Sequence, residues 1–253
     1  MSRQRVLAGF HAVAARLRVA ADTIEAIYFD PRRRDGRMQQ LQERARQARV
    51  RLVAADSERL RGLAGDAPHQ GVVAVAAAIQ QLLSLDDVLA AVHPDTLLLV
   101  LDGVTDPRNL GACLRVADAA GVDAVVVPRD RSAGITPAAV KAAAGAAESV
   151  ALIDVTNLAR ALDAIADAGV VTVGAAGEAE VSLFDIDLGG PTAWVLGAEG
   201  SGLRRLTRER CDRLVRIPLR GSVESLNVSV AAGICLFETV RQRLAAQPSG
   251  RAE

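Results

Sequence analysis

The feature that most constrains the fold is a run of five large apolar residues, Leu97 to Leu101, that ends at Asp102 and Gly103. A strand with one face in water alternates apolar and polar residues, whereas an unbroken apolar run is expected of a strand covered on both faces. Further strands are predicted along the chain, with helical patterns between them, at 123–128, 149–155, 170–176, 192–200 and 213–219. This alternation predicts an α/β domain with a mostly parallel sheet and helices on both faces.

The first 78 residues have a shorter and more mixed pattern. Helices are predicted at 9–18, 38–50 and 58–65, and strands at 26–30, 50–55 and 69–77. We therefore expect a small N-terminal α/β domain at 1–78 that binds RNA, a linker with one short helix at 79–95, a second domain at 96–247 and a disordered tail at 248–253.

The charge of the chain is zero overall but unevenly distributed. Residues 1–78 contain 14 Arg and 8 acidic residues, a net of +6, so the remainder carries −6. A basic N-terminal segment followed by an acidic remainder is typical of a polyanion-binding module joined to a second domain. The densest cluster of basic residues in this segment is Arg32, Arg33, Arg34 and Arg37. A solvated arginine-rich face explains the same charge equally well.

Several classes of protein are disfavoured. No run reaches the roughly 18 apolar residues of a membrane span, and no secretory segment is visible, which favours the cytoplasm. The three Cys residues form no CxxC pair, so no metal site is predicted. Glycines 197, 200 and 202 give GxxGxG rather than the dinucleotide pattern GxGxxG, which argues against a dehydrogenase.

Three loops rich in Gly and short polar residues follow predicted strands, at 102–109, 197–203 and 220–227. Ligands of open α/β sheets bind at the carboxyl ends of strands. One such loop is usually an ordinary turn, but three at one edge predict a binding site. The last leads into an almost wholly apolar helix, which we expect in the core. Asn227 lies at its start, either as an N-cap or as a site residue, and Gly233 allows close backbone approach.

The segments LDGVTDPRNLGACLR, WVLGAEGSGL and IPLRGSVESLNVSVAAGICLFE resemble, in order and spacing, the three motifs of the SpoU class of RNA ribose 2′-O-methyltransferases. The resemblance covers about 150 residues, and GFHAV and HQGVVA resemble the substrate-binding domain of that class. It implies S-adenosyl-L-methionine as methyl donor, an obligate homodimer, and a SPOUT-type domain with a trefoil knot. The motifs are most like those of members that methylate a guanosine of the peptidyl-transferase P loop in 23S rRNA.

The resemblance also implies roles for individual residues. Arg115 matches the essential arginine, acting either as base or as an electrostatic stabiliser, and Asn109 and Glu199 complete the catalytic set. Asn109 is also expected to cap the helix predicted at 109–120. Glu199 would orient Arg115 or Asn109. The residues implied for the cofactor are Leu196, Gly197, Gly200, Ile217, Leu219, Leu226 and Asn227. Apart from the resemblance, Arg204 and Arg205 on the basic segment after GAEGSG are expected to contact the substrate near the active site, and Ser225 is expected to contact the substrate or to order the third loop.

Two other functions stay open at this point. The same chemistry on tRNA or on another rRNA site uses the same motifs. A catalytically silent RNA-binding protein of ribosome assembly is the alternative from another class, although it would not need Asn109, Arg115, Glu199 and Asn227 together.

Overall fold

The computed structural model describes residues 4–65, 67–77, 84–200 and 202–246. The chain divides into two compact units, Met1–Gln81 with Ala144–Ser149, and Leu82–Ala143 with Val150–Glu253. No sequence pattern predicted that the short segment Ala144–Ser149 groups with the first unit. The predicted tail at 248–253 and the start of the predicted linker lie outside the described residues.

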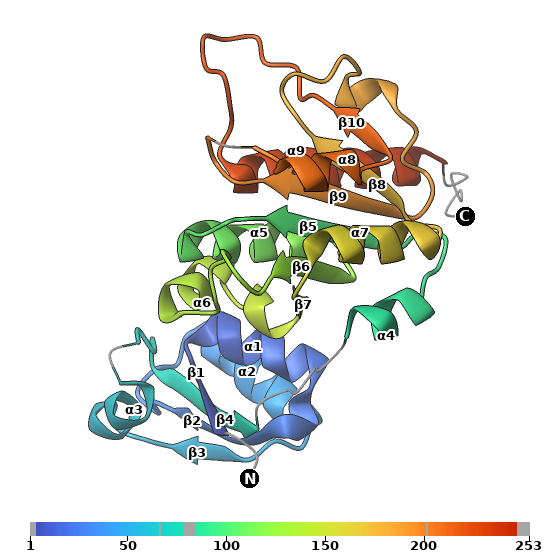
Figure 1. The fold of residues 1–253 in the computed structure, drawn as a ribbon. Coiled ribbons are helices and arrows are strands. Elements are labelled where there is room, and N and C mark those ends of the chain that lie inside the picture. The colour runs from blue at the N-terminus through green and yellow to red at the C-terminus, as the bar shows by residue number, and fades with distance from the viewer. Residues whose placement is uncertain (1–3, 66, 78–83, 201, 247–253) are drawn as a thin grey trace. The chain divides into compact units, whose positions relative to one another are not determined.

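The first unit contains a four-stranded sheet of mixed direction (Figure 1). Its strand order is β1-β4-β2-β3; β4 runs antiparallel to β1 and β2, and β2 runs parallel to β3. The strand bounds are β1 (Gln4–Ala8), β2 (Ile24–Phe29), β3 (Leu52–Ala54) and β4 (Val72–Ala77). The small N-terminal α/β layer predicted from the sequence is therefore present.

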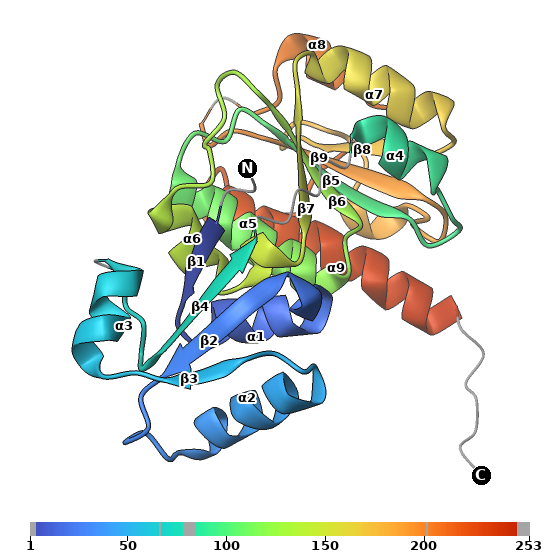
Figure 2. The same cartoon turned by 90° about the horizontal axis from the view of Figure 1, so that it is seen from below.

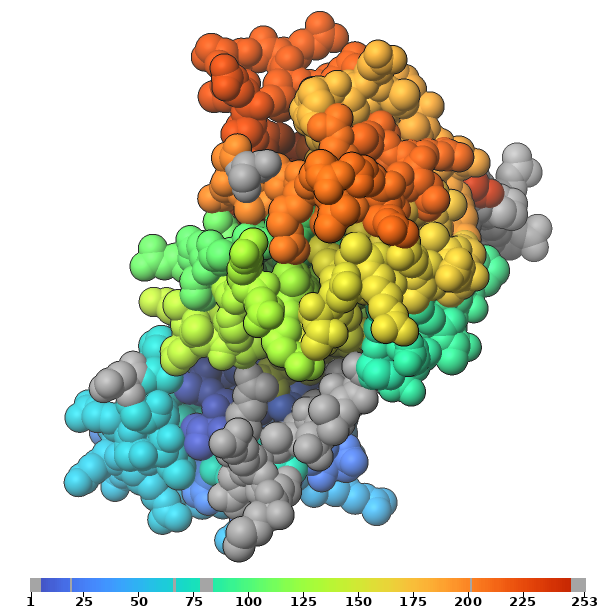
Figure 3. Space-filling model, viewed as in Figure 1, coloured from blue at the N-terminus to red at the C-terminus, as the bar shows by residue number. Residues whose placement is uncertain are grey.

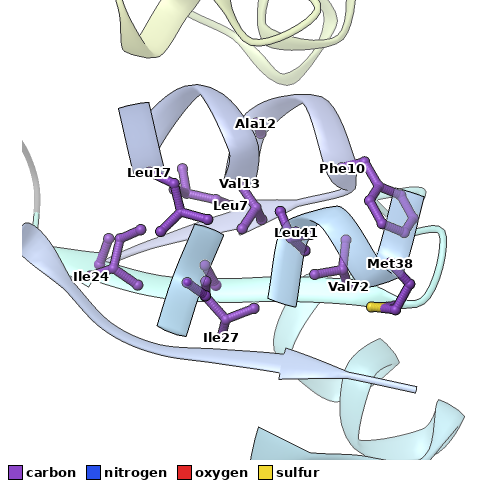
Figure 4. Close-up of a cluster of buried hydrophobic side chains, with 13 residues drawn as sticks. Leu7, Phe10, Ala12, Val13, Leu17, Ile24, Ile27, Met38, Leu41 and Val72 are labelled. Carbon is purple, nitrogen blue, oxygen red and sulfur yellow. The ribbon is translucent and has the colours of Figure 1, made fainter. Parts of the chain in front are cut away.

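Helices cover both faces of this sheet. Helices α1 (Phe10–Val19) and α2 (Gly36–Gln47) enclose one apolar cluster with strand residues such as Ile27 and Val72, as Figure 4 shows. Helix α3 (Ser57–Ala64) packs on the other face, where Leu60 meets Val73. Asp35 and Asp56 accept hydrogen bonds from main-chain N–H groups at the starts of α2 and α3, as N-caps do.

The second unit contains a six-stranded sheet in which every paired strand is parallel, in the order β10-β8-β9-β5-β6-β7. The central strand, β5 (Leu97–Asp102), is buried along its whole length, which confirms the interpretation of the apolar run. The other strands are β6 (Ala124–Pro128), β7 (Ala151–Val155), β8 (Val171–Ala175), β9 (Thr192–Gly197) and β10 (Arg213–Val215).

Helices lie on both faces of this sheet as well (Figure 2). On one face, α4 (Leu85–Ala90) and α7 (Leu158–Asp167) pack on alternate strand residues such as Leu98 and Val195. On the other face lie α5 (Pro107–Ala120) and α9 (Val228–Ala246), the latter fixed where Trp194 Nε1 donates to Thr239 Oγ1 at 2.9 Å. Two short helices, α6 (Pro137–Ala143) and α8 (Arg205–Glu209), complete the unit.

Three sequence-based expectations about local structure are wrong. The strand predicted at 213–219 ends at Val215, so Ile217 and Leu219 belong to a loop. Asp106, not Asn109, caps α5, because a proline at the first helical position starts that helix two residues earlier than predicted. Asp102 is the last residue of β5 rather than part of a loop.

The expectation for the last helix also needs correction. Only one side of α9 is buried, and Val230, Phe237 and Leu244 are exposed to 50%, 46% and 63%. A Cβ added at Gly233 would meet only a Val116 methyl group at 3.7 Å, so within the chain this glycine is not required for close approach. No helix among the described residues is long and apolar enough to cross a bilayer.

The glycine that packing does require is Gly111 in α5. A Cβ at this position would lie 2.3 Å from the Ala139 carbonyl oxygen of α6, a rigid main-chain atom. We predict that Gly111→Ala lowers the free energy of unfolding by more than about 1–3 kcal/mol, as overpacking does. The matched control is Gly62→Ala in α3, where nothing lies within 4 Å, and a gain of about 0.5–1 kcal/mol is expected. Urea denaturation measures the free energy of unfolding of both variants. Equal changes in the two variants would contradict the packing argument.

Candidate functional site

Two of the three predicted loops start side by side at the carboxyl edge of the parallel sheet. Strands β5 and β9 are neighbours, and their last residues, Asp102 and Gly197, are partners in the register. The loop after β5 leads into α5, and the loop after β9 leads into α8. The third loop follows β10 and returns to the start of α9. The placement expected for a ligand site in an α/β sheet is thus present.

The centre of the site is the carboxylate of Glu199, in the loop after β9. Its Oε1 accepts hydrogen bonds from Asn109 Nδ2 at 3.0 Å, from Asn227 Nδ2 at 2.6 Å and from the main-chain N–H of Val228 at 3.4 Å. The three donors come from α5, the third loop and the start of α9. Of the two roles expected for Glu199, the structure supports the orientation of Asn109.

Asn227 serves both of the purposes that the sequence left open. Its Oδ1 accepts from the main-chain N–H of Ser229 at 2.9 Å, so it caps α9. Its Nδ2 donates to Asn109 Oδ1 at 3.0 Å as well as to Glu199. Asn109, Glu199 and Asn227, which we call the site triad, are therefore fixed by one another. A carboxylate beside the N-terminus of a helix is also favoured by the helix dipole.

A second carboxylate, that of Asp102, was missed in the sequence analysis. Its side chain is fully buried and accepts from the main-chain N–H of Arg204 at 2.9 Å and from the Arg204 guanidinium. Ala198 and Gly202 pair within the same loop, and a Cβ at Gly197 would lie 2.0 Å from the carbonyl carbon of Gly202. The loop that carries Glu199 is thus folded back on itself and tied to β5.

The predicted cofactor residues lie along two of the loops. Leu196 is buried at the end of β9, and Gly200 has a positive φ of 82° with open space where a Cβ would stand. In the third loop Ile217 and Leu226 are half-buried, whereas Leu219 and Ser225 are exposed. This loop forms part of the outer surface in Figure 3, and its main-chain N–H groups from Ile217 to Leu226 find no partner among the described residues.

Arg115 is not brought together with the site triad. It lies six residues after Asn109 in α5, so the two side chains are separated by about 120° around the helix axis. Its side chain is exposed and has no hydrogen-bond or ion-pair partner among the described residues. A guanidinium held in this way is available to a group from outside the chain.

The remaining arginines of the prediction are partly committed to internal contacts. Arg204 pairs with Asp102, and Arg205 Nη1 donates to Glu209 Oε1 at 2.6 Å. In the first unit, Arg32 forms two hydrogen bonds of 3.1 Å to the Asp30 carboxylate and lowers its pKa. Arg33 pairs with Asp35, whereas Arg34 and Arg37 are exposed.

The cysteines do not offer a nucleophile. Burial raises the pKa of the Cys113 and Cys235 thiols to about 12, and that of Cys211 equally, so all three are protonated at neutral pH. Among the described residues, no group of three or more His, Cys, Asp or Glu side chains is placed to hold a metal ion.

A parallel α/β unit with this three-loop edge, combined with a small α/β unit, is the architecture of two-domain RNA ribose methyltransferases. A crystal structure described as an RNA 2′-O ribose methyltransferase superposes with a TM-score of 0.75 at 29% identity, covering 96% of this chain and 90% of that one. AviRb from Streptomyces viridochromogenes, solved in complex with AdoMet, gives 0.75 at 26% identity, with coverage of 96% and 92%.

The sequence comparison is more specific. The SpoU rRNA Methylase family matches residues 96–237, and the RNA 2′-O ribose methyltransferase substrate binding family matches residues 6–82. The chain belongs to the SpoU rRNA methylase family. The 23S rRNA (guanosine-2′-O-)-methyltransferase RlmB of Ralstonia nicotianae is 60% identical over 243 residues, covering 96% of this chain and 98% of that protein.

The contact between Asp102 and Arg204 yields a prediction. We expect Asp102→Asn to cost about 1.5–3 kcal/mol of unfolding free energy, because hydrogen bonds to a buried charge are lost. Amide exchange at 202–204 should also accelerate, as measured by mass spectrometry. The matched control is Asp106→Asn, four residues along the chain, where Asn caps a helix as well as Asp does. Slow exchange in Asp102→Asn would show that Asp102 does not hold the loop.

Proposed function

We propose that this protein transfers a methyl group from S-adenosyl-L-methionine to the ribose 2′-hydroxyl of a guanosine in the P loop of 23S rRNA. The observation that carries the proposal is the site triad, which joins all three motif loops at one edge of the sheet. The named function of the relative from Ralstonia nicotianae supports the substrate. Because rRNA is the substrate, we place the reaction in the cytoplasm.

The residues at the edge fit the proposed cofactor. An adenine ring needs apolar side chains on its faces and main-chain groups at its edge, and the third loop offers both. Ile217 and Leu226 are half-buried, and the N–H groups between them are unpartnered within the described residues. Leu196, Gly197 and Gly200 border the neighbouring loop, Leu219 adds apolar surface, and Asn227 fixes the end of the third loop. When bound, the cofactor supplies an electrophilic methyl group.

The contribution of the protein is mainly to position the groups. Methyl transfer requires the attacking oxygen in line with the bond that breaks, and fixed orientation is a large source of acceleration. The site triad holds the starts of α5 and α9 rigidly for this purpose, and exposed Ser225 contacts the RNA. A free guanidinium stays charged at neutral pH. We therefore assign Arg115 to stabilising the developing 2′-alkoxide and the adjacent phosphate.

We predict that Arg115→Ala retains affinity for S-adenosyl-L-methionine and lowers the turnover of methylation about 10²- to 10³-fold, the loss typical of one oxyanion donor. Calorimetry measures the affinity and transfer of a tritiated methyl group measures turnover. Arg160→Ala is the control, because Arg160 is an exposed arginine of α7. Normal turnover in Arg115→Ala would remove Arg115 from the mechanism.

We further propose that the site is completed in a homodimer. Val230, Phe237 and Leu244 are spaced by seven residues, so they form one exposed apolar stripe along α9. A Cβ added at Gly233 would lie 3.7 Å from a Val116 methyl group, so this part of α9 runs beside α5, the helix that carries Arg115. A second copy packed by two-fold symmetry on these helices would cover the stripe. The unpartnered Arg115 of one copy would then reach the cofactor site of the other copy.

The dimer gives a direct prediction. Phe237→Asp should convert the protein to a monomer, because a charge replaces the centre of the stripe and cannot be desolvated there. The matched control is Phe184→Asp, since Phe184 is also exposed, to 56%, but lies outside α9. Light scattering measures the mass of each species. A dimeric Phe237→Asp protein would place the interface elsewhere.

Family membership is also our reason for proposing that the segment from β10 into α9 forms a trefoil knot. The experiment that tests the function as a whole is a map of ribose methylation across rRNA and tRNA, in cells with and without this protein. Loss of one methyl group from a P-loop guanosine of 23S rRNA is expected. A change in tRNA, at another rRNA site, or at no site would overturn the proposed substrate.

A further inference from the structure

The arginines of the first unit fall into two groups that the sequence does not separate. Arg32 is used locally, through Asp30 and through Ser57 Oγ at 2.9 Å. Arg34, Arg37 and Arg44 are exposed, and their side chains have no hydrogen-bond or ion-pair partner in the described part of the chain. Positive charge that is not neutralised within the protein is available to a partner.

Two of these free arginines, Arg37 and Arg44, lie on one side of α2. Arg37, Gln40 and Arg44 follow at intervals of three and four residues, which places them on one flank of the helix, about 10 Å from end to end. We call these three residues the α2 flank. Arg46 is about 180° around the helix from Arg37 and is paired with Glu43 at 3.7 Å. The opposite side of the same helix therefore carries no free charge at that position.

The α2 flank borders a hollow. An open pocket of about 550 Å³ is lined by Arg33, Asp35, Gly36, Arg37 and Gln40. This volume lies in the range of small-molecule sites, which is sufficient for one nucleotide.

Arg33 is fixed at the wall of this hollow. Its guanidinium carbon lies 4.6 Å from the centre of the Phe10 ring, and its nitrogens pair with Asp35 and with the carbonyl oxygen of Gln70. A planar group held in this way needs no ordering when a ligand arrives. Unstacked bases of RNA stack on guanidinium planes and form hydrogen bonds along their edges.

We propose that the α2 flank and the hollow bind an unpaired stretch of the RNA substrate. Arg37 and Arg44 contact successive backbone phosphates, and one unstacked base enters the hollow against Arg33, with Gln40 at its edge. A base must leave its stack to enter, so the surface selects single-stranded RNA over duplex. This inference rests on the proposed function for the identity of the RNA, and it assigns capture of the substrate to a face of the first unit.

The test uses the full chain and a fluorescein-labelled loop fragment of 23S rRNA, with anisotropy measured over a salt titration. Each phosphate contact to a single strand contributes about 0.7 to the slope of log K against log salt. Arg37→Gln combined with Arg44→Gln should therefore flatten the slope by about 1.4 and weaken binding about tenfold at about 0.15 M salt. The matched control removes two charges elsewhere in the unit, as Arg46→Gln with Arg61→Gln, and should bind within about twofold of the original protein.

The hollow is tested by Arg33→Lys, which keeps the charge but not the plane, and by Gln40→Glu, which leaves the contacts of Arg33 intact. Arg33→Lys should weaken binding without changing the slope. Gln40→Glu should also weaken binding, because it places a carboxylate at the edge of the hollow. Equal loss in the two double variants would show that only net charge matters and overturn the proposal. So would equal affinity for a duplex of the same sequence.

The two proposals can fail separately. If the Arg37 and Arg44 variant binds and methylates the fragment normally, the surface is wrong and the proposed function stands. If the original protein does not methylate rRNA, yet this variant alone loses affinity, the surface stands and the proposed reaction is wrong.

Discussion

The site depends on one carboxylate oxygen, Oε1 of Glu199, on which three segments distant in the sequence converge. Each donor alone would be a weak surface hydrogen bond. Together they fix the start of α5, the end of the third loop and the first turn of α9 in one arrangement. Since Asn109 and Asn227 also bond to each other, moving any member disturbs the other two. A site that must align an attacking oxygen with a methyl group needs this kind of mutual constraint.

Glu199 can serve in this way only because its own loop is anchored to the end of the central strand. Asp102 is buried at the end of the central strand, and it binds both the main chain and the side chain of Arg204. Detaching the loop would leave a buried carboxylate without partners, at a large cost in free energy. The loop is therefore held against the packed sheet. The stability of the apolar core is thereby transmitted to an exposed polar site. The Arg204 guanidinium is thereby partly committed to Asp102, and a contact of its exposed part with RNA stays a prediction.

Local sequence pattern predicted the architecture and the placement of the loops, because both depend on residues that are close in the chain. The apolar run at 97–101 identified the buried central strand. The pairing of Asp102 with Arg204 joins positions that are 102 residues apart, and no local pattern encodes it. Asn109 was assigned to the cap of α5 because Asn is a good cap, but Asp106 precedes a proline that already has helical φ. The orientation of Arg115 could not be read either, because it depends on where the helix begins.

The two surfaces that remain without a partner differ in chemistry and point to different partners. The stripe of Val230, Phe237 and Leu244 is apolar, and its seven-residue spacing suits a second helix. The α2 flank is cationic and polar, beside a hollow of nucleotide size, and it suits a polyanion whose bases can be unstacked. An apolar stripe cannot attract a phosphate backbone, and free guanidinium groups would repel one another across a two-fold axis. Under the two proposals, the unit with the active-site loops carries the surface for self-association, and the N-terminal unit carries the surface for the RNA. In this arrangement Arg115 is the residue at which the two surfaces meet in function, because both the second copy and the bound RNA would contact it.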